Sequence, residues 1–201
     1  MVRMKLLYLN APTSLAGAER VILTYLQQYD REQFLPLVTS YLNELRPDNE
    51  FTREVERLGI SFSRIRLRGY RGLGRQISET AHIISSEGIS VVHSHGYRSD
   101  IIGLLAARRA GVPIVSTLHG WTPVNRSLRI YEALDRLVLR WFDHIICVSR
   151  PLYEQMRRRL PFNRVTFLPN AVSTPPADGL APRARSTTRK TILFVGRLSH
   201  E

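Results

Sequence analysis

Three histidines stand at the ends of two short apolar segments, where an imidazole could meet a ligand. His93 and His95 close the first segment, and His119 closes the next one. Two residues apart on a strand, His93 and His95 would face the same side and could bind a metal ion, but no third ligand at suitable spacing is visible. His119 stands beside Gly120 and could offer its imidazole or backbone groups to a bound molecule. A purely structural role for His119 is the alternative.

The residues between these histidines predict how they are positioned. An apolar pair at 91–92 predicts a strand, and the apolar residues at 101–106 predict a helix that Gly111 ends. Pro113 then opens a second strand at 114–115. Strand, helix and strand in about thirty residues form a βαβ unit, whose strands are parallel and joined by a right-handed crossover. Both strands therefore end at the same carboxyl edge of the sheet, which is where open α/β sheets bind ligands.

The rest of the chain repeats this alternation of strand and helix. Apolar runs separated by glycine, proline and asparagine predict seven strands, and apolar residues at helical spacing predict the helices between them. The expected strands are 5–9, 34–41, 60–65, 91–92, 114–115, 144–148 and 165–168. The expected helices are 15–29, 49–58, one ending near 87, 101–110, 128–141 with a cap at Asn125, and one whose first residue is Pro151, with Ser149 as its cap. The pattern predicts a doubly wound, parallel α/β sheet of the Rossmann-like kind.

Small, polar or basic residues follow most of the predicted strands. Ala16–Gly17 lies in the loop before the first helix, where backbone N–H groups and the positive helix end could approach an anion. A tight turn without a ligand is the alternative for this loop. Ser149, Asn170 and Arg197 follow three later strands. Because parallel strands deliver such residues to one edge, we expect a cleft there.

The charge of the chain is strongly positive and uneven. The net charge is +12, and 27 of the 29 basic residues are arginine. The second half of the chain carries most of the surplus. The single cysteine, Cys147, lies in an apolar run, which indicates a reducing compartment such as the cytosol. No apolar run approaches the roughly 18 residues that a membrane span needs.

One glycine-rich segment gathers five of the arginines. Such a segment predicts attraction to an anionic membrane surface. A nucleic acid is the alternative partner for a basic chain, but the arginines are scattered over several elements without interleaved aromatic residues, so we expect no nucleic-acid partner. The five residues of the segment are Arg64, Arg66, Arg68, Arg71 and Arg75.

Several catalytic motifs are missing from the sequence. No Gly-x-Gly-x-x-Gly follows the first strand, and there is no Walker-type lysine, Gly-x-Ser-x-Gly or Cys-x-x-Cys motif. Paired carboxylates do not gather at the strand ends, which disfavours the acid–base pair of a glycosidase. We therefore expect no cofactor and no metal.

The composition changes after residue 172. Residues 173–189 contain three prolines and almost no bulky apolar side chain, which is typical of a linker. The apolar run TILFV at 191–195 then predicts a new buried strand. We expect one domain at 1–172, a linker at 173–189 and the first strand of a second, truncated domain at 190–201.

Six motifs, taken together and in order, resemble those of a known family. They are LAGAER at 15–20, VVHSH at 91–95, TLHG at 117–120, VS at 148–149, FLPNAV at 167–172 and ILFVGRL at 192–198. This ordered set resembles the N-terminal domain of the retaining, GT-B-fold glycosyltransferases of family four. The similarity covers essentially the whole chain.

The resemblance implies that the complete enzyme has two Rossmann-like domains with different roles. The first domain mainly holds the acceptor, and the second holds the nucleotide-sugar. The resemblance also implies that Gly17 and Arg197 lie near the donor diphosphate and that His119, the expected catalytic residue, lies near the reacting sugar. The other expected substrate-binding residues are Ala16, which replaces a glycine common in the family, and His95, Gly120, Ser149 and Asn170.

The expected function follows from this resemblance. It is transfer of a sugar from a nucleotide-sugar donor to a glycan or lipid-linked acceptor, with retention of anomeric configuration. A non-catalytic, acceptor-type partner subunit is the alternative. We expect the protein in the cytoplasm, attached peripherally to the inner face of the membrane. The family's donor-gripping lysine and glutamates would fall beyond residue 201, so we expect the 201-residue chain alone to be inactive.

Overall fold

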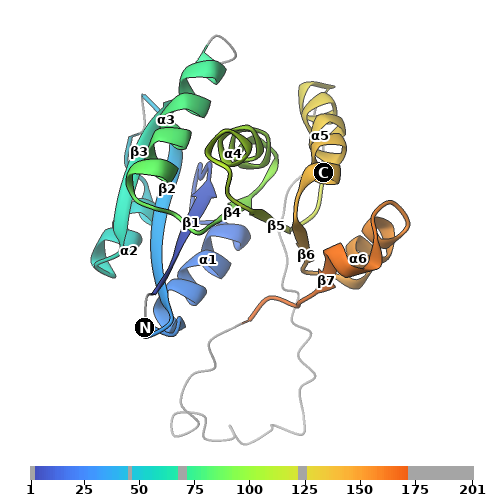
Figure 1. Cartoon of the computed structure of the whole chain (residues 1–201), viewed down its shortest axis with the longest axis horizontal. Coiled ribbons are helices and arrows are strands. Elements are labelled where there is room, and N and C mark those ends of the chain that lie inside the picture. Colours follow the sequence, from blue (N-terminus) through green and yellow to red (C-terminus); the bar gives the residue numbers. More distant parts are fainter. Residues whose placement is uncertain (1–2, 45–46, 68–71, 122–125, 172–201) are drawn as a thin grey trace, which may run out of the picture.

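Seven parallel strands form the centre of the protein in the computed structural model (Figure 1). The structure describes residues 3–44, 47–67, 72–121 and 126–171. The strands lie in the order β3-β2-β1-β4-β5-β6-β7, and every neighbouring pair is parallel. Their bounds are β1 Met4–Asn10, β2 Phe34–Asn43, β3 Ser61–Leu67, β4 Val91–His95, β5 Ile114–Leu118, β6 His144–Cys147 and β7 Val165–Phe167. The doubly wound α/β fold predicted from the sequence is confirmed.

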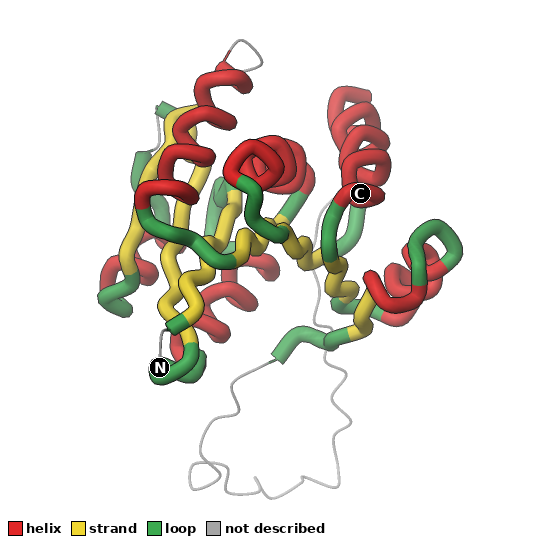
Figure 2. Tube along the Cα trace, viewed as in Figure 1, coloured by secondary structure: helices red, strands yellow, loops and turns green. Residues whose placement is uncertain are grey.

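Helices cover both faces of this sheet (Figure 2). On one face α1 and α2 pack against Tyr8 and Val38, and on the other α3 and α4 pack against Leu7 and Leu9. Leu7, Tyr8 and Leu9 alternate between the two faces and are all buried, which is why β1 is a continuous apolar run. The helices are α1 Gly17–Gln28, α2 Glu50–Arg57, α3 Leu73–Ser86, α4 Tyr97–Ala110, α5 Arg126–Val138 and α6 Arg150–Arg157, with short 3-10 helices at Leu139–Trp141 and Phe162–Arg164.

The strand order reverses between β1 and β4, and this reversal creates the place for a site. The helix after β1, α1, packs on one face of the sheet, while the helix after β4, α4, packs on the other. The two helices therefore diverge from the carboxyl ends of neighbouring strands. A crevice at that point is the usual ligand site of a doubly wound sheet.

The predicted βαβ unit at residues 91–121 is present as β4, α4 and β5. Gly111, with φ at 72°, ends α4 in the left-handed conformation that suits glycine. Both strands continue through polar residues to His95 and Leu118, further than their apolar pairs predicted, because backbone pairing between β4 and β5 extends to His95 and Thr117. The expected cap at Asn125, the linker at 173–189 and the strand at 190–201 lie outside the described residues.

Helix α4 approaches the sheet through Gly103. A Cβ atom added there would lie 3.0 Å from Leu9 Cδ1 and 3.2 Å from Ile114 Cδ1. We expect Gly103→Val to lower the free energy of unfolding by about 1–3 kcal/mol through overpacking. The matched control is Gly74→Val in α3, where an added Cβ meets nothing within 4 Å. Urea unfolding of both variants tests this expectation. Equal decreases in the free energy of unfolding would mean that the interface between α4 and the sheet can accommodate the larger side chain.

Candidate active site

The two histidine rings of β4 form a column with the tyrosine ring of β1 and with the ring of His119, which follows β5. Tyr8 pairs with His93 across the sheet, and their ring centroids are 5.2 Å apart. The His93 and His95 centroids are 4.5 Å apart, and those of His95 and His119 are 5.6 Å apart. Residues two apart on a strand face the same side, so the sequence spacing produces this column.

Burial keeps the three imidazoles neutral near pH 7, and hydrogen bonds fix how two of them are oriented. His93 Nε2 lies 2.8 Å from Thr117 Oγ1, and His95 Nδ1 lies 3.2 Å from His119 Nε2. Burial lowers the pKa of His93 to about 4 and holds the pKa of His95 well below its usual value. Burial also lowers the pKa of His119. In a neutral pair one ring nitrogen donates to the other, as the contact between His95 and His119 requires.

A cavity of about 370 Å³ opens beside this column at the carboxyl edge of the sheet. His119, half-buried, and Gly120 line it together with His95 and with Ala18 and Glu19 from the first turn of α1. Gly120 has φ at 114°, so the chain turns there through a conformation that favours glycine. The structure thus places His119 in a cleft next to the Gly17 loop, as expected. Its catalytic role stays a prediction.

The N-terminus of α1 is closed by its own side chain. Glu19 Oε2 accepts a hydrogen bond from the Ala16 backbone N–H at 3.2 Å. A negative charge therefore already stands at the helix end where the diphosphate was expected, although burial raises the pKa of Glu19. Gly17 itself lines a different hollow, which is formed by residues of α1 and α2 and by Asn170.

The other expected binding residues are spread more widely. Ser149 occupies the N-cap position of α6 but makes no capping hydrogen bond through its side chain. This helix begins at Arg150 rather than at Pro151. Ser149 lines neither of the two hollows described above, and Arg197 lies outside the described residues. The sequence predicted one cleft along all the strand ends. The structure has a cavity around the carboxyl ends of β4 and β5, and neither Ser149 nor Asn170 lines it.

Three acidic residues of the cavity were missed in the sequence. Asp100 on α4 and Glu132 and Asp135 on α5 line it and are nearly inaccessible to solvent. All three lie on helices and none at a strand end, so the pattern of polar residues after the strands does not reveal them. One signal was available for Asp100, because it repeats at helical spacing with buried Leu104 and Ala107. Within the described residues, no group of three or more histidine, cysteine or acidic side chains is arranged to hold a metal ion.

The sequence profile of Glycosyltransferase Family 4 matches residues 15–175, which include the whole of this cavity except Ala11 and Thr13. The chain belongs to Glycosyltransferase Family 4. It is 25% identical over 156 residues to the alpha-maltose-1-phosphate synthase of Mycolicibacterium smegmatis, which covers 67% of this chain and 40% of that protein. It is 28% identical over 97 residues, 45% of this chain and 25% of the relative, to an Escherichia coli alpha-1,3-galactosyltransferase that acts with UDP-Gal on a diphosphoundecaprenol-linked sugar.

Solved structures share the fold of this family member. The Anabaena HepE structure in complex with UDP-glucose superposes with a TM-score of 0.69 at 17% identity, over 89% of this chain and 48% of that one. A UDP-GlcNAc 2-epimerase from Neisseria meningitidis, bound to UDP-GlcNAc, superposes with a TM-score of 0.63 at 15% identity, over 82% of this chain and 45% of that one. The chain thus spans about half the length of these structures, and its fold alone does not separate transfer from epimerisation.

Proposed function

We propose that this chain is the acceptor-side domain of a retaining glycosyltransferase. The transferase moves a sugar from a nucleotide-sugar to a glycan or lipid-linked acceptor and needs no further cofactor. The observation that carries the proposal is His119, neutral and half-buried, at a cavity formed almost entirely within the segment that matches Family 4. The UDP-Gal and lipid-linked acceptor in the name of the E. coli relative, and the UDP-glucose in the HepE complex, support this choice of substrates.

The lining of the cavity suits a sugar. Tyr97 and Trp121 supply aromatic surface. His95 Nε2 and Ser99 Oγ are buried polar atoms of lining residues, and neither has a hydrogen-bond partner among the residues that the structure describes. Buried polar atoms are costly when unpaired, and sugar hydroxyls can both donate to and accept from such groups. A bound sugar would therefore satisfy groups that the described residues leave unsatisfied.

Neutral His119 fits the charge changes of glycosyl transfer. A sugar carbon that is losing its leaving group becomes positively charged, and a neutral imidazole does not repel it. The departing nucleoside diphosphate gathers negative charge, which fixed donors stabilise. We assign that role to the backbone N–H groups at Gly17 and to Arg197. The Glu19 carboxylate, which accepts from the neighbouring Ala16 N–H, must then move away from the helix end. The complete transferase is then this domain together with a nucleotide-sugar domain that closes over it.

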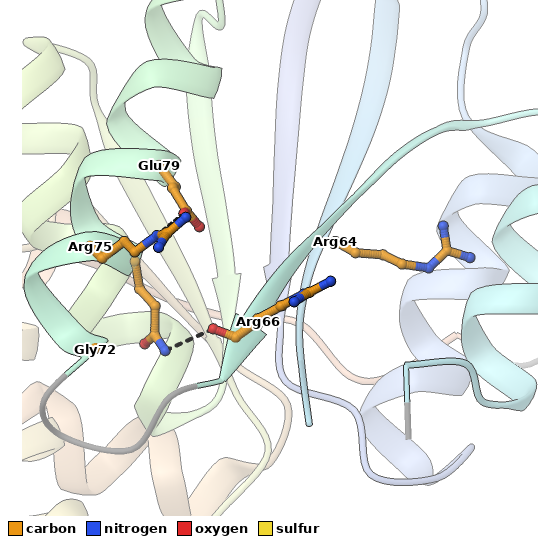
Figure 3. A pocket seen from close by; sticks show the side chains of 6 residues that line it. Arg64, Arg66, Gly72, Arg75 and Glu79 are labelled. Atoms are coloured by element: carbon orange, nitrogen blue, oxygen red, sulfur yellow. Dashed lines mark hydrogen bonds and ion pairs between the residues drawn. The ribbon is translucent and has the colours of Figure 1, made fainter. Parts of the chain in front are cut away.

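The proposed membrane surface of this domain rests on fewer free arginines than the sequence implied. Arg64 pairs with Asp48 at 2.9 Å and with Glu56 at 2.6 Å. Figure 3 shows Arg75 beside Glu79, to which it is bonded at 2.6 Å, and Arg64 directed away from them. Arg66 is exposed and has no carboxylate partner in the described part of the chain, whereas Arg68 and Arg71 lie outside the described residues. None of the helices in the described part has both the length and the continuous apolar surface of a membrane-spanning helix.

We expect Arg66→Gln to weaken binding to anionic vesicles. The loss should be about 1 kcal/mol, or roughly fivefold in the partition constant, because the free guanidinium contributes most. Arg64→Gln is the matched control and should change binding less, since two carboxylates already neutralise Arg64. Vesicle sedimentation at low and high salt measures both variants. Equal binding to neutral and anionic vesicles would contradict the proposed surface.

The proposed function is tested by sugar transfer itself. The complete transferase is incubated with lipid-linked and glycan acceptors and a panel of labelled UDP-, GDP- and ADP-sugars. We expect label in the acceptor with at least one donor. Epimerisation of a free nucleotide-sugar without transfer, or binding of acceptor without turnover, would instead favour the epimerase chemistry of one fold relative or a non-catalytic partner subunit.

A further inference from the structure

Two carboxyl groups meet in the interior of the protein beside the cavity. Asp100, in the first turn of α4, has no solvent exposure, and Asp135 on α5 is 1% exposed. Each acid keeps one buried carboxyl oxygen, Asp100 Oδ2 and Asp135 Oδ1, that has no hydrogen-bond partner among the described residues. A hydrogen bond between the two acids requires a proton on one of them, because two carboxylates can only accept.

The remaining oxygens of the pair accept hydrogen bonds from side chains of β4, β5 and the turn after β5. Asp100 Oδ1 accepts hydrogen bonds from Ser94 Oγ of β4 at 2.5 Å and from Ser116 Oγ of β5 at 2.9 Å. Asp135 Oδ2 accepts from Trp121 Nε1 at 2.9 Å. The pair thus connects the two central strands to Trp121, which directly follows His119 and Gly120.

The charged groups around the pair do not neutralise two carboxylates. On α5, Glu132 is buried, and Arg136 lies 3.9 Å from Glu132 and 4.7 Å from the centre of the Trp121 ring. On α3, which packs against α4, the exposed Arg75 and Glu79 pair with each other. The strands β4 and β5 present only Ser94 and Ser116 to Asp100. Arg98 of α4, Glu19 of α1 and the neutral His95 and His119 also line the cavity.

Two ionised carboxylates in this position would be strongly unfavourable. Removing a carboxylate from water costs several kcal/mol, and a second one at hydrogen-bonding distance adds repulsion. Burial, and then the charge of Asp135, raises the pKa of Asp100 well above its usual range. Burial also raises the pKa of Asp135. One proton held between the acids removes the repulsion and completes the hydrogen bonds of both.

We propose that Asp100 and Asp135 share one proton and act as a positioning pair that holds Trp121, and with it the turn at His119 and Gly120, against the cavity. In this pair Asp100 Oδ2–H donates to Asp135 Oδ1, while Asp135 stays ionised and accepts from Trp121. At alkaline pH the proton passes to water, two negative charges face each other between α4 and α5, and Trp121 loses its fixed place. The importance of the pair for sugar transfer rests on the proposed function, whereas its hold on Trp121 does not.

The pH dependence has a definite sign. A carboxyl whose pKa is raised in the folded state binds its proton more tightly there than in the unfolded chain. Its stabilising contribution is complete at acidic pH and is lost as the pH rises through the raised pKa. The folded protein should therefore lose stability, and the Trp121 site its order, on the alkaline side.

Amide variants mimic the protonated pair without the titration. In Asp100→Asn, the amide oxygen can accept from Ser94 and Ser116 while the amide nitrogen donates to Asp135. In Asp135→Asn, the oxygen can accept from Trp121 while the nitrogen donates to Asp100. Both variants should hold the turn in place at every pH. Asp143→Asn is the matched control, because Asp143 is an exposed acid that accepts one hydrogen bond, from the Ile114 N–H at 2.9 Å.

The experiment follows Trp121 fluorescence in the 201-residue chain from pH 5 to pH 10. The chain has two tryptophans, and Trp141→Phe leaves Trp121 as the only tryptophan whose emission is followed. We expect a red shift with rising pH in this background and in Asp143→Asn, and emission fixed at its acidic value in Asp100→Asn and Asp135→Asn. Neither donor nor acceptor sugar is present, so the result is independent of transfer activity.

Each outcome decides the proposal. No shift in the Trp141→Phe background, or the same shift in both amide variants, overturns the shared proton. If one amide variant does not fold, as judged by far-UV circular dichroism, the other decides. Failure of both to fold also overturns the proposal, since an amide should satisfy the same hydrogen bonds as the protonated acid.

Discussion

Replacing His119 by alanine is expected to lower the turnover of the complete transferase by about 100-fold, the usual effect of removing one polar group that acts on the transition state. His119 is half-buried, lines the cavity and contacts His95 through a single hydrogen bond at 3.2 Å. Its loss should therefore change the free energy of unfolding by only about 1 kcal/mol. Steady-state kinetics and urea unfolding of the same preparation separate the two effects.

The matched control for this variant is His82→Ala. His82 is exposed on α3, away from the residues that line the cavity. It should leave both turnover and stability unchanged. If His119→Ala instead abolishes cooperative unfolding, or retains full turnover, His119 is a structural histidine and the catalytic assignment is wrong.

The 201-residue chain by itself is expected to transfer no sugar. In the proposed arrangement the donor is held by one domain and the acceptor by another, and transfer depends on the effective molarity gained when they close. The chain spans 48% of the length of the Anabaena HepE structure that it resembles. The seven-stranded sheet, with a core on each face, should fold without a partner domain.

Two measurements on the purified chain test this expectation: the release of nucleoside diphosphate and the labelling of the acceptor. A folded but inactive chain, judged by its unfolding curve, agrees with the expectation. Turnover at a rate typical of transferases that is lost in His119→Ala would contradict it, because the donor would then have to bind within the described domain.

The sequence predicted the fold because its signals are local and repeated. The apolar runs of β1 and β2 and the glycines that end α2, α3 and α4 recur at the spacing of a βαβ unit. Parallel pairing then placed His95 and His119 at one edge without any knowledge of their contacts. The positions of these two residues could therefore be predicted from strand ends alone.

The contacts around these residues could not be predicted in the same way. Asp100 and Asp135 are 35 positions apart on different helices, and only the packing of α4 against α5 brings them together. The sequence predicts that Arg64 is a free cation, whereas in the structure it forms ion pairs with Asp48 and Glu56. Glu19 closes the helix end that Gly17 was expected to open to a diphosphate. Charge pairing depends on side-chain placement, which spacing does not reveal.

The most direct test of the account is the anomeric configuration of the product made by the complete transferase. The acceptor is incubated with the nucleotide-sugar that labels it, and the coupling of the new anomeric proton in the purified product is measured by NMR. The account predicts that an α-linked donor gives an α-linked product. A β-linked product, or hydrolysis and epimerisation of the donor with no glycoside formed, would contradict it.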